Sequence, residues 1–220
     1  MTNYSWDVII FQIIFPSMGV TLLMVLCATV LACLLGFCLA IALFWVGKHG
    51  LSPNEKCYSM LNIVVSFIRS FPFIILAISI LPITRFITGS VIGWESALFP
   101  LTVAATPFMG RIFENCFKEV SLDLIDAARS FGATNLQIVF KILIPATLPS
   151  IVNGGVLSVI QILSLTTIAG TLGAGGIGAS ALIYGYQSFN DKIMYTLVIV
   201  LFILVLAIQL LGDYVYKRIK

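Results

Sequence analysis

Charged residues are scarce in this sequence. Only 10% of its 220 residues are charged, whereas soluble domains usually carry about 25%. Hydrophobic residues make up 60% and the mean hydropathy is +1.11. A water-soluble protein could not bury so many apolar side chains, so we expect lipid to surround most of the chain. The net charge of +3 is small, which argues against nucleic acid as a partner.

The motifs of common catalytic and metal sites are missing as well. There is no P-loop of the form GxxxxGK[ST], so this chain is not expected to bind ATP. No Ser–His–Asp or Cys–His arrangement is recognisable, and the single histidine, His49, has no potential metal ligands beside it. The five cysteines form no CxxC pair and lie mostly in apolar surroundings. We therefore predict that the chain is not an enzyme and has no catalytic residue, no metal site and no bound cofactor.

The N-terminus lacks the basic region of a secretory signal, because Asp7 is the only charged residue before Lys48. Residues 4–15 are apolar but too short to cross a membrane, and they end at Pro16. We predict that residues 1–17 form an interfacial segment in which 4–15 are helical. Trp6 is expected at the level of the lipid headgroups.

Five apolar stretches approach the length of about 20 residues that a helix needs to span a bilayer. They cover residues 18–46, 58–81, 91–110, 150–169 and 193–212. The third is the weakest, because it contains Glu95, Pro100 and Pro107. The predicted fold class is all-α: a polytopic membrane protein with five transmembrane helices in a single domain over residues 1–220.

The basic residues predict how these spans are oriented. Arg85 and Lys192 fall on one side of the membrane, and Arg69 lies within a span. The other nine fall on the opposite side: Lys48, Lys56, Arg111, Lys118, Arg129, Lys141, Lys217, Arg218 and Lys220. The positive-inside rule places the N-terminus outside and the C-terminus in the cytoplasm. Residues 111–149 then form a long cytoplasmic loop.

The first half of this loop has the features of a short helix. Ser121 is a suitable N-cap, and Asp123 places a negative charge at the positive end of the helix dipole. Leu124, Ala128 and Phe131 follow at helical spacing and predict one apolar face.

A second helix is predicted after a glycine turn. Gly132 is a favourable helix stop, and Thr134 and Gln137 have the spacing of a capping box. Pro145 and Pro149 are expected to break this second helix before the fourth span. By physics alone, the loop either inserts into a groove on another protein or covers the ends of its own spans.

The same loop resembles the EAA loop of ABC importer permeases. Asp126-Ala127-Ala128, Gly132-Ala133 and Ile142-Leu143-Ile144-Pro145 have the spacing of that motif throughout, with Asp126 in place of Glu and Ile144 in place of Leu. The resemblance implies a type I ABC importer permease fold, and a coupling helix that docks on a separate ATPase. The residues that it implies for coupling are Asp126, Ala127, Ala128, Arg129, Gly132, Ala133 and Pro145.

Other segments resemble the methionine ABC importer permeases. They are residues 68–76, 82–85, 89–93, 173–178, 184–187 and 189–190. This resemblance implies a homodimer in the bacterial inner membrane, two copies of an ATPase subunit that binds ATP-Mg, and an external substrate-binding protein or lipoprotein. The substrate would be an amino acid, namely methionine, including its D-isomer or derivatives. We expect membrane lipid as a further partner.

Polar residues inside the spans are candidates for the translocation pathway. Arg69 is charged within the second span, so it either faces a pathway or gate, or extends to the membrane surface. Asn153, Ser158, Gln161 and Ser164 lie in the fourth span, where they either bond between helices or line the pathway. Ser158 and Gln161 are three residues apart and are expected to share a face.

The alternative function is a stand-alone secondary transporter or channel for a small polar solute. Such transporters usually contain internal repeats with broken helices. No repeat is visible between the two halves of the sequence, and only one EAA-like loop is present. The sequence therefore favours the importer permease.

Overall fold

The computed structural model describes residues 5–219, and these residues form helices and connecting turns without any strand. Residues 1–4 of the predicted interfacial segment, and Lys220 of the basic set, lie outside this range. The α-helices are α1 (Phe15–Val46), α2 (Glu55–Ser70), α3 (Phe73–Ser79), α4 (Leu81–Thr88), α5 (Trp94–Lys118), α6 (Leu122–Ser130), α7 (Asn135–Ile138), α8 (Ile144–Ala169), α9 (Gly176–Ser180) and α10 (Asp191–Ile219). The π-helical segments are η1 (Val8–Ile14), η2 (Val139–Leu143), η3 (Gly170–Ala174) and η4 (Ala181–Gln187).

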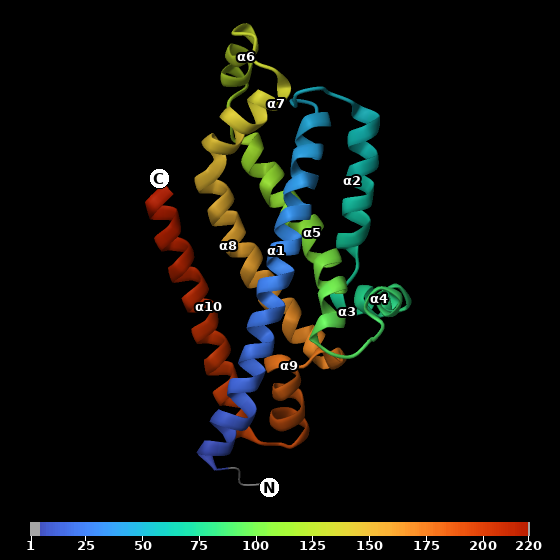
Figure 1. The fold of residues 1–220 in the computed structure, drawn as a ribbon, viewed down its shortest axis with the longest axis vertical. Helices are drawn as coiled ribbons and strands as arrows, with labels where there is room; N and C mark the ends of the chain where they lie inside the picture. The colour runs from blue at the N-terminus through green and yellow to red at the C-terminus, as the bar shows by residue number, and fades with distance from the viewer. Residues whose placement is uncertain (1–4, 220) are drawn as a thin grey trace.

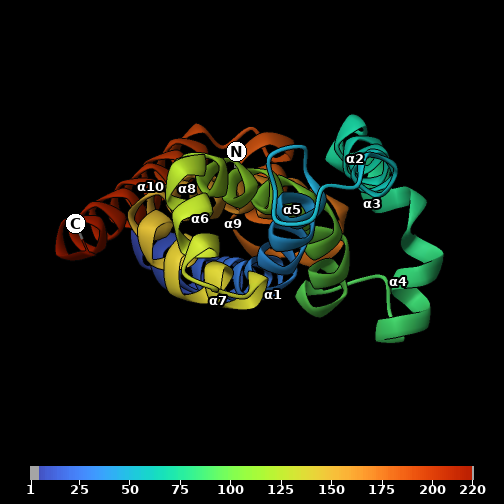
Figure 2. The same cartoon turned by 90° about the horizontal axis from the view of Figure 1, so that it is seen from above.

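The helices form one elongated bundle (Figure 1). α1 runs through its middle against α5 and α8, with α10 on one side and α2 to α4 on the other, as the view from above also shows (Figure 2). α6 and α7 protrude at one end. α1 begins at the opposite end, and α10 runs from that end towards the end with α6. The predicted all-helical class is confirmed.

Four continuous helical stretches are long and apolar enough to cross a membrane: Val8–Val46, Trp94–Lys118, Asn135–Ala174 and Asp191–Ile219. A fifth candidate is the pair of α2 and α3, which is bent by 103°. Four of the five spans predicted from hydropathy are therefore present by length and composition, and the fifth is present if the bent pair is one span. Not all of them have the predicted shape or bounds.

The second span, predicted as one helix over 58–81, is broken at Phe71 and Pro72. Both residues have extended backbone, with ψ values of 134° and 137°. A proline disfavours helical backbone at the residue before it and has no N–H for the helix ladder. The break turns α3 away from α2 and places Arg69 in the last turn of α2, next to the bend.

The predicted interruption at Pro16 is wrong. η1 runs directly into α1, so one continuous helix extends from Val8 to Val46 instead of a separate short helix followed by a span. Pro16 lies in the first turn of α1, just after π-helical turns. These wider turns reduce the clash between a proline ring and the preceding carbonyl groups. Trp6 lies near the start of this helix and makes a cation–π contact with the Lys192 ammonium group, which is 3.9 Å from its ring centroid.

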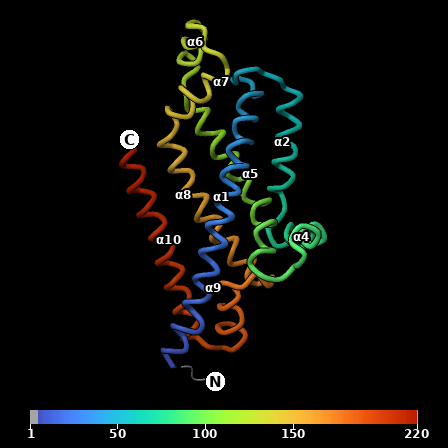
Figure 3. Tube along the Cα trace, viewed as in Figure 1, coloured from blue at the N-terminus to red at the C-terminus, as the bar shows by residue number. Residues whose placement is uncertain are grey.

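Pro145 and Pro149 do not break the helix either. α7, η2 and α8 form one helical stretch from Asn135 to Ala174, and Figure 3 shows the trace passing from α7 into α8 without a turn. Pro145 follows the π-helical η2, and Pro149 is accommodated inside α8. The third span also extends to Lys118 rather than ending at 110. The non-helical parts of the predicted 111–149 loop are therefore the short turns that flank α6.

Close packing in the bundle depends on small residues where helices cross. A side chain at Gly36 of α1 would place its Cβ 2.9 Å from the Met109 Cβ atom of α5. A Cβ at Gly154 of α8 would lie 2.3 Å from the Ile112 Cγ2 atom. Gly154 therefore lets α8 approach α5 closely. Gly155 has no heavy atom within 4 Å of such a Cβ, so it has no comparable role within one chain.

The glycine-rich segment after α8 interrupts the helix. Gly173, Gly175 and Gly176 have φ values of +100°, +81° and +77°, which are strained for other residues. The segment is folded against the start of α1: Ile177 donates its N–H to the Thr21 hydroxyl at 2.9 Å, and the Ser17 and Ser180 hydroxyl groups bond at 2.5 Å.

Large apolar side chains cover much of the outside of the bundle. Leu26 and Leu34 of α1 are 64% and 62% exposed, and Phe202 and Leu210 of α10 are 62% and 67% exposed. Such a surface is unfavourable in water and is expected for helices in lipid. The surplus of apolar residues noted in the sequence is therefore located on these outer faces.

Candidate functional site

The protruding element at one end of the bundle is α6 with the turn that follows it. Gly132 has a φ of +79° and ends the helix, as predicted. Thr134 and Gln137 form the predicted capping box, with both reciprocal bonds present. Ser121 occupies the N-cap position with extended backbone, but its side chain makes no capping bond.

The predicted apolar face of α6 is divided in the structure. Ala128 is buried together with Ile125, whereas Leu124 is 45% and Phe131 is 92% exposed. Ile125 and Ala128 therefore attach α6 to its own bundle, and Leu124 and Phe131 point away from it. One face of α6 therefore covers the end of its own bundle, and the other face is exposed.

The EAA-like residues are placed on both sides of this division. Arg129 donates from Nη2 to the carbonyl oxygen of Leu51 at 2.7 Å, which ties α6 to the turn between α1 and α2. Its Nη1 lies 3.7 Å from the Asp126 carboxylate, whose side chain is 71% exposed. Ala127 is exposed, and Ala133 donates its N–H to the Ala128 carbonyl at 3.1 Å. Asp126 is therefore available at the surface, and Arg129 serves as an anchor.

A buried carboxylate below α6 was not identified from the sequence. Glu114 of α5 has 0% exposure and accepts hydrogen bonds from Arg111 at 2.6 Å, Lys118 at 2.6 Å and the Tyr58 hydroxyl at 3.2 Å. Arg111 also donates to the Asn62 side chain. The available sequence signal was the spacing of the charged residues: Arg111 lies three residues before Glu114, and Lys118 lies four residues after it. This cluster holds α2 against α5.

Some polar residues of α8 are exposed and others are buried. Asn153, Gln161 and Ser164 are exposed, and with Leu157 and Ile168 they form a stripe along one face of α8 at spacings of three and four residues. Ser158 is fully buried and donates to the carbonyl oxygen of Gly154 at 2.9 Å. The expectation that Ser158 and Gln161 share one face is therefore wrong, because the helix twist turns Ser158 into the bundle.

Arg69 and Gln161 line one cavity of about 270 Å³ beside the bend between α2 and α3. The rest of the cavity lining is mainly apolar and includes Phe71, Phe108 and Leu165. The cavity thus combines one cation and one amide with apolar walls, as small-molecule sites commonly do.

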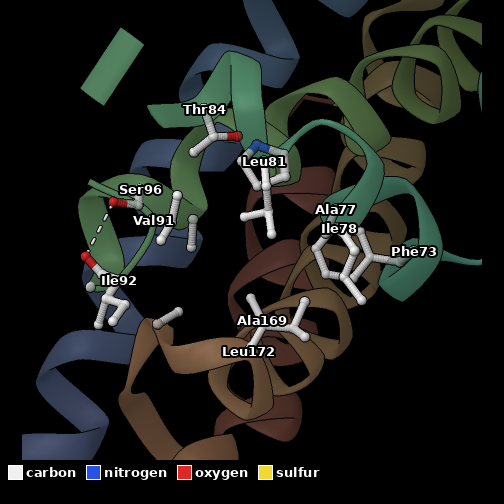
Figure 4. A pocket seen from close by; sticks show the side chains of 14 residues that line it. Phe73, Ala77, Ile78, Leu81, Thr84, Val91, Ile92, Ser96, Ala169 and Leu172 are labelled. Carbon is white, nitrogen blue, oxygen red and sulfur yellow. Dashed lines mark hydrogen bonds between the residues drawn. The ribbon is translucent and has the colours of Figure 1, made fainter. Parts of the chain in front are cut away.

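A smaller cavity of about 140 Å³ lies where α3 and α4 face α5 and η3 (Figure 4). Its lining is mostly apolar and has no charged side chain. The Ser96 hydroxyl donates to the Ile92 carbonyl at 3.2 Å, and the Thr84 hydroxyl donates to the Ile80 carbonyl at 3.1 Å. Because these polar groups are already satisfied, this cavity is less suited to a charged or zwitterionic solute than the one beside Arg69.

No group of three or more His, Cys, Asp or Glu residues is arranged to hold a metal ion within the part of the chain that the structure describes. His49 lies exposed in the turn between α1 and α2.

Known proteins match this chain over nearly its whole length. The family model of the binding-protein-dependent transport system inner membrane component matches residues 45–220. The probable D-methionine transport system permease protein MetI of Vibrio cholerae is 37% identical over 218 residues, which are 99% of this chain and 97% of the relative. The methionine import system permease protein MetP of Bacillus subtilis is 37% identical over 171 residues, 78% of this chain and 77% of the relative.

Solved structures agree with these relatives. A structure of the MetNI methionine ABC transporter in inward-facing conformations matches with a TM-score of 0.95 and 34% identity, covering 99% of this chain and 100% of that one. An amino acid ABC transporter with histidines shares the fold at a TM-score of 0.79 and 17% identity, over 99% of this chain and 100% of that one. The chain therefore belongs to the family of binding-protein-dependent transport system inner membrane components and is a permease subunit of an ABC importer.

Proposed function

We propose that this permease imports methionine, including D-methionine or derivatives, and that α6 couples it to a separate ATPase subunit. The observation that carries the coupling is the exposure of Phe131 and Leu124 on an element that protrudes from the bundle. The methionine assignment is supported by the relatives and the solved importer that match the chain from end to end. ATP-Mg would be bound by the ATPase and not by this chain.

In this proposal, one face of α6 is attached to the permease bundle and the other face contacts the ATPase. The Arg129 bond to the Leu51 carbonyl and the buried Ile125 and Ala128 fix α6 to the bundle. Phe131 and the exposed carboxylate of Asp126 face outward, where they can contact the ATPase. A helix laid into a groove of a partner is a common mode of recognition. The remaining residues of the EAA-like motif, Ala127, Gly132, Ala133 and Pro145, would shape this element.

The proposed assembly contains two permease chains, two ATPase subunits and an external binding protein. The exposed stripe with Asn153, Gln161 and Ser164 supports the dimer, because polar side chains are unfavourable against lipid and favour burial by protein or contact with water. Two copies of the chain about a two-fold axis can line a water-filled path between them with these polar side chains. The positive-inside pattern places the N-terminus outside and the C-terminus with α6 in the cytoplasm.

We place Arg69 and Gln161 on the translocation pathway, because both line the same cavity at the bend between α2 and α3. Asn153 and Ser164 extend the pathway along the exposed stripe of α8. Ser158 is not part of this pathway, because its side chain is fully buried and its hydroxyl donates to the Gly154 carbonyl of the same helix.

Transport competition tests the proposed function. The permease, reconstituted with its ATPase and binding protein, is expected to take up labelled methionine only with ATP, and excess D-methionine should compete whereas an acidic amino acid should not. Replacing the P-loop lysine of the ATPase serves as the control. Uptake that persists in that control would instead support a stand-alone secondary transporter.

Changing Arg69 to Ala should lower methionine uptake about 10-fold or more, because loss of a charged hydrogen-bond donor commonly costs about 1.5–3 kcal/mol. The assembled complex should still be recovered in normal amounts, since Arg69 is exposed in the single chain. Arg85→Ala, which changes another exposed arginine on α4, is the matched control. Full uptake by the Arg69 variant would remove this residue from the pathway.

A further inference from the structure

A cavity of about 320 Å³ lies at the end of the bundle that carries α6. It is bounded by the end of α1, the turn that follows, the start of α2 and the end of α5. Lys48, His49 and Lys118 contribute basic side chains to its lining. Val120 and Leu122 contribute apolar ones. Neither the coupling role of α6 nor the pathway beside Arg69 uses this cavity.

The positive charge around the cavity exceeds the negative charge. Arg111 and Lys118 share one carboxylate, Glu114, at 2.6 Å each, which leaves one positive charge of this cluster uncompensated. Lys48 adds a second cation at the rim. Glu119 lies exposed just after α5, and its carboxylate accepts a hydrogen bond from the Ser150 hydroxyl at 2.6 Å. Glu119 keeps its charge but does not line the cavity. The lining contains three basic residues and no acidic one, so the cavity is suited to an anion.

The turn that presents Lys48 and His49 is ordered by its own backbone. Gly50 donates its N–H to Gly47 at 2.9 Å, and Ser52 donates to the Trp45 carbonyl at 2.9 Å. Any Cβ at Gly50 would come within 1.9 Å of the Phe44 carbonyl oxygen, so the turn is packed tightly onto the end of α1. The backbone of both basic residues is thus held at the cavity before a ligand arrives.

The surface of α2 indicates the depth of the cavity in the membrane. Met60, Ile63 and Phe67 are 72%, 63% and 62% exposed, which is expected of a surface in the apolar part of the bilayer. Before them, α2 begins with charged residues at Glu55 and Lys56. The lining residue Tyr58 lies at this change from charged to apolar surface, a level at which aromatic residues commonly meet lipid headgroups.

We propose that this cavity binds the phosphate group of an anionic phospholipid. Lys48 and His49 would donate to the phosphate oxygens beside the charged Lys118, and the acyl chains would run from there into the bilayer, away from α6 (Figure 1). Basic pockets between membrane helices commonly bind acidic headgroups. Inorganic phosphate shares the anionic chemistry, but it would make no use of the position of the cavity at the membrane surface.

Native mass spectrometry of the detergent-purified permease–ATPase complex tests this site. With equal amounts of phosphatidylglycerol and phosphatidylcholine added, the complex should retain phosphatidylglycerol preferentially. Lys48→Gln should lower that retention about fivefold, the usual effect of one cation near an anionic lipid. The double change with His49→Gln should lower it further. Lys217→Gln, an exposed lysine near the end of α10, is the matched control and should leave retention unchanged.

Three results would overturn the proposal. The first is equal phosphatidylglycerol retention by the unmodified complex and the double variant. The second is displacement of phosphatidylglycerol by millimolar inorganic phosphate, which would assign the cavity to a soluble anion. The third is loss of the ATPase from the Lys48 variant without a change in lipid retention, which would assign it to a protein contact.

Discussion

Replacing Phe131 with aspartate is expected to abolish ATP-driven uptake while the permease remains folded in the membrane. Phe131 lies at the end of α6 and is 92% exposed, so the folded chain gains little from its ring. A bulky apolar side chain at the tip of a protruding element is typical of an anchor for a partner. Aspartate would place a charge where the proposed ATPase groove must be apolar.

The expected loss of affinity for the ATPase can be estimated from aromatic anchor residues in other protein interfaces. Loss of a central aromatic anchor commonly costs about 2 kcal/mol or more, which lowers affinity roughly 30-fold. Retention of the ATPase subunit on the tagged permease, measured after detergent extraction, should fall accordingly, and uptake should fall with it. Phe189→Asp is the matched control, because Phe189 is 80% exposed and lies in the turn before α10. Normal ATPase retention by the Phe131 variant would refute docking through this residue.

Replacing Glu114 with alanine is expected to destabilise the permease by about 3–5 kcal/mol, the usual cost of removing one partner from a buried charge cluster. Glu114 is completely buried and accepts hydrogen bonds from Arg111, Lys118 and Tyr58. Its loss would leave the Arg111 guanidinium group without its carboxylate partner. It would also remove the hydrogen bond from Tyr58, which is one of the connections between α2 and α5.

The thermal unfolding temperature of the purified permease measures this effect. Glu119→Ala, a nearby exposed glutamate, is the matched control and should change the unfolding temperature little. Glu114→Gln should fall between the two, because glutamine keeps the bond to the Tyr58 hydroxyl but not the charge. An unchanged unfolding temperature for Glu114→Ala would show that α2 is held by other contacts.

Several features of the fold were predictable because their causes are local. The capping box of Thr134 and Gln137 and the left-handed stop at Gly132 each depend on a few adjacent residues. The membrane-spanning character of the chain depends on composition over about 20 residues and not on which neighbour a helix meets. The positions of the five apolar stretches were therefore visible before any packing was known.

The effect of each proline could not be predicted in this way. Pro72 interrupts a span, whereas Pro16 and Pro145 lie in continuous helices. The last two follow π-helical turns, which accommodate the ring, while Phe71 before Pro72 takes extended backbone. Whether a helix adopts such turns depends on what its side chains pack against, and this information lies far away in the sequence.

The sequence by itself determined an all-helical membrane protein with a structured loop between its third and fourth spans. Only the tertiary structure decided which functional candidates and polar residues of this protein are buried and which remain accessible. Glu114 and Ser158 face the inside of the bundle, whereas Gln161 and Arg69 share a cavity and Phe131 has no neighbour to cover it. The physical reason is that a residue's exposure depends on helices brought beside it by packing. Helical periodicity can place residues on one face, but it cannot say which neighbour that face will meet.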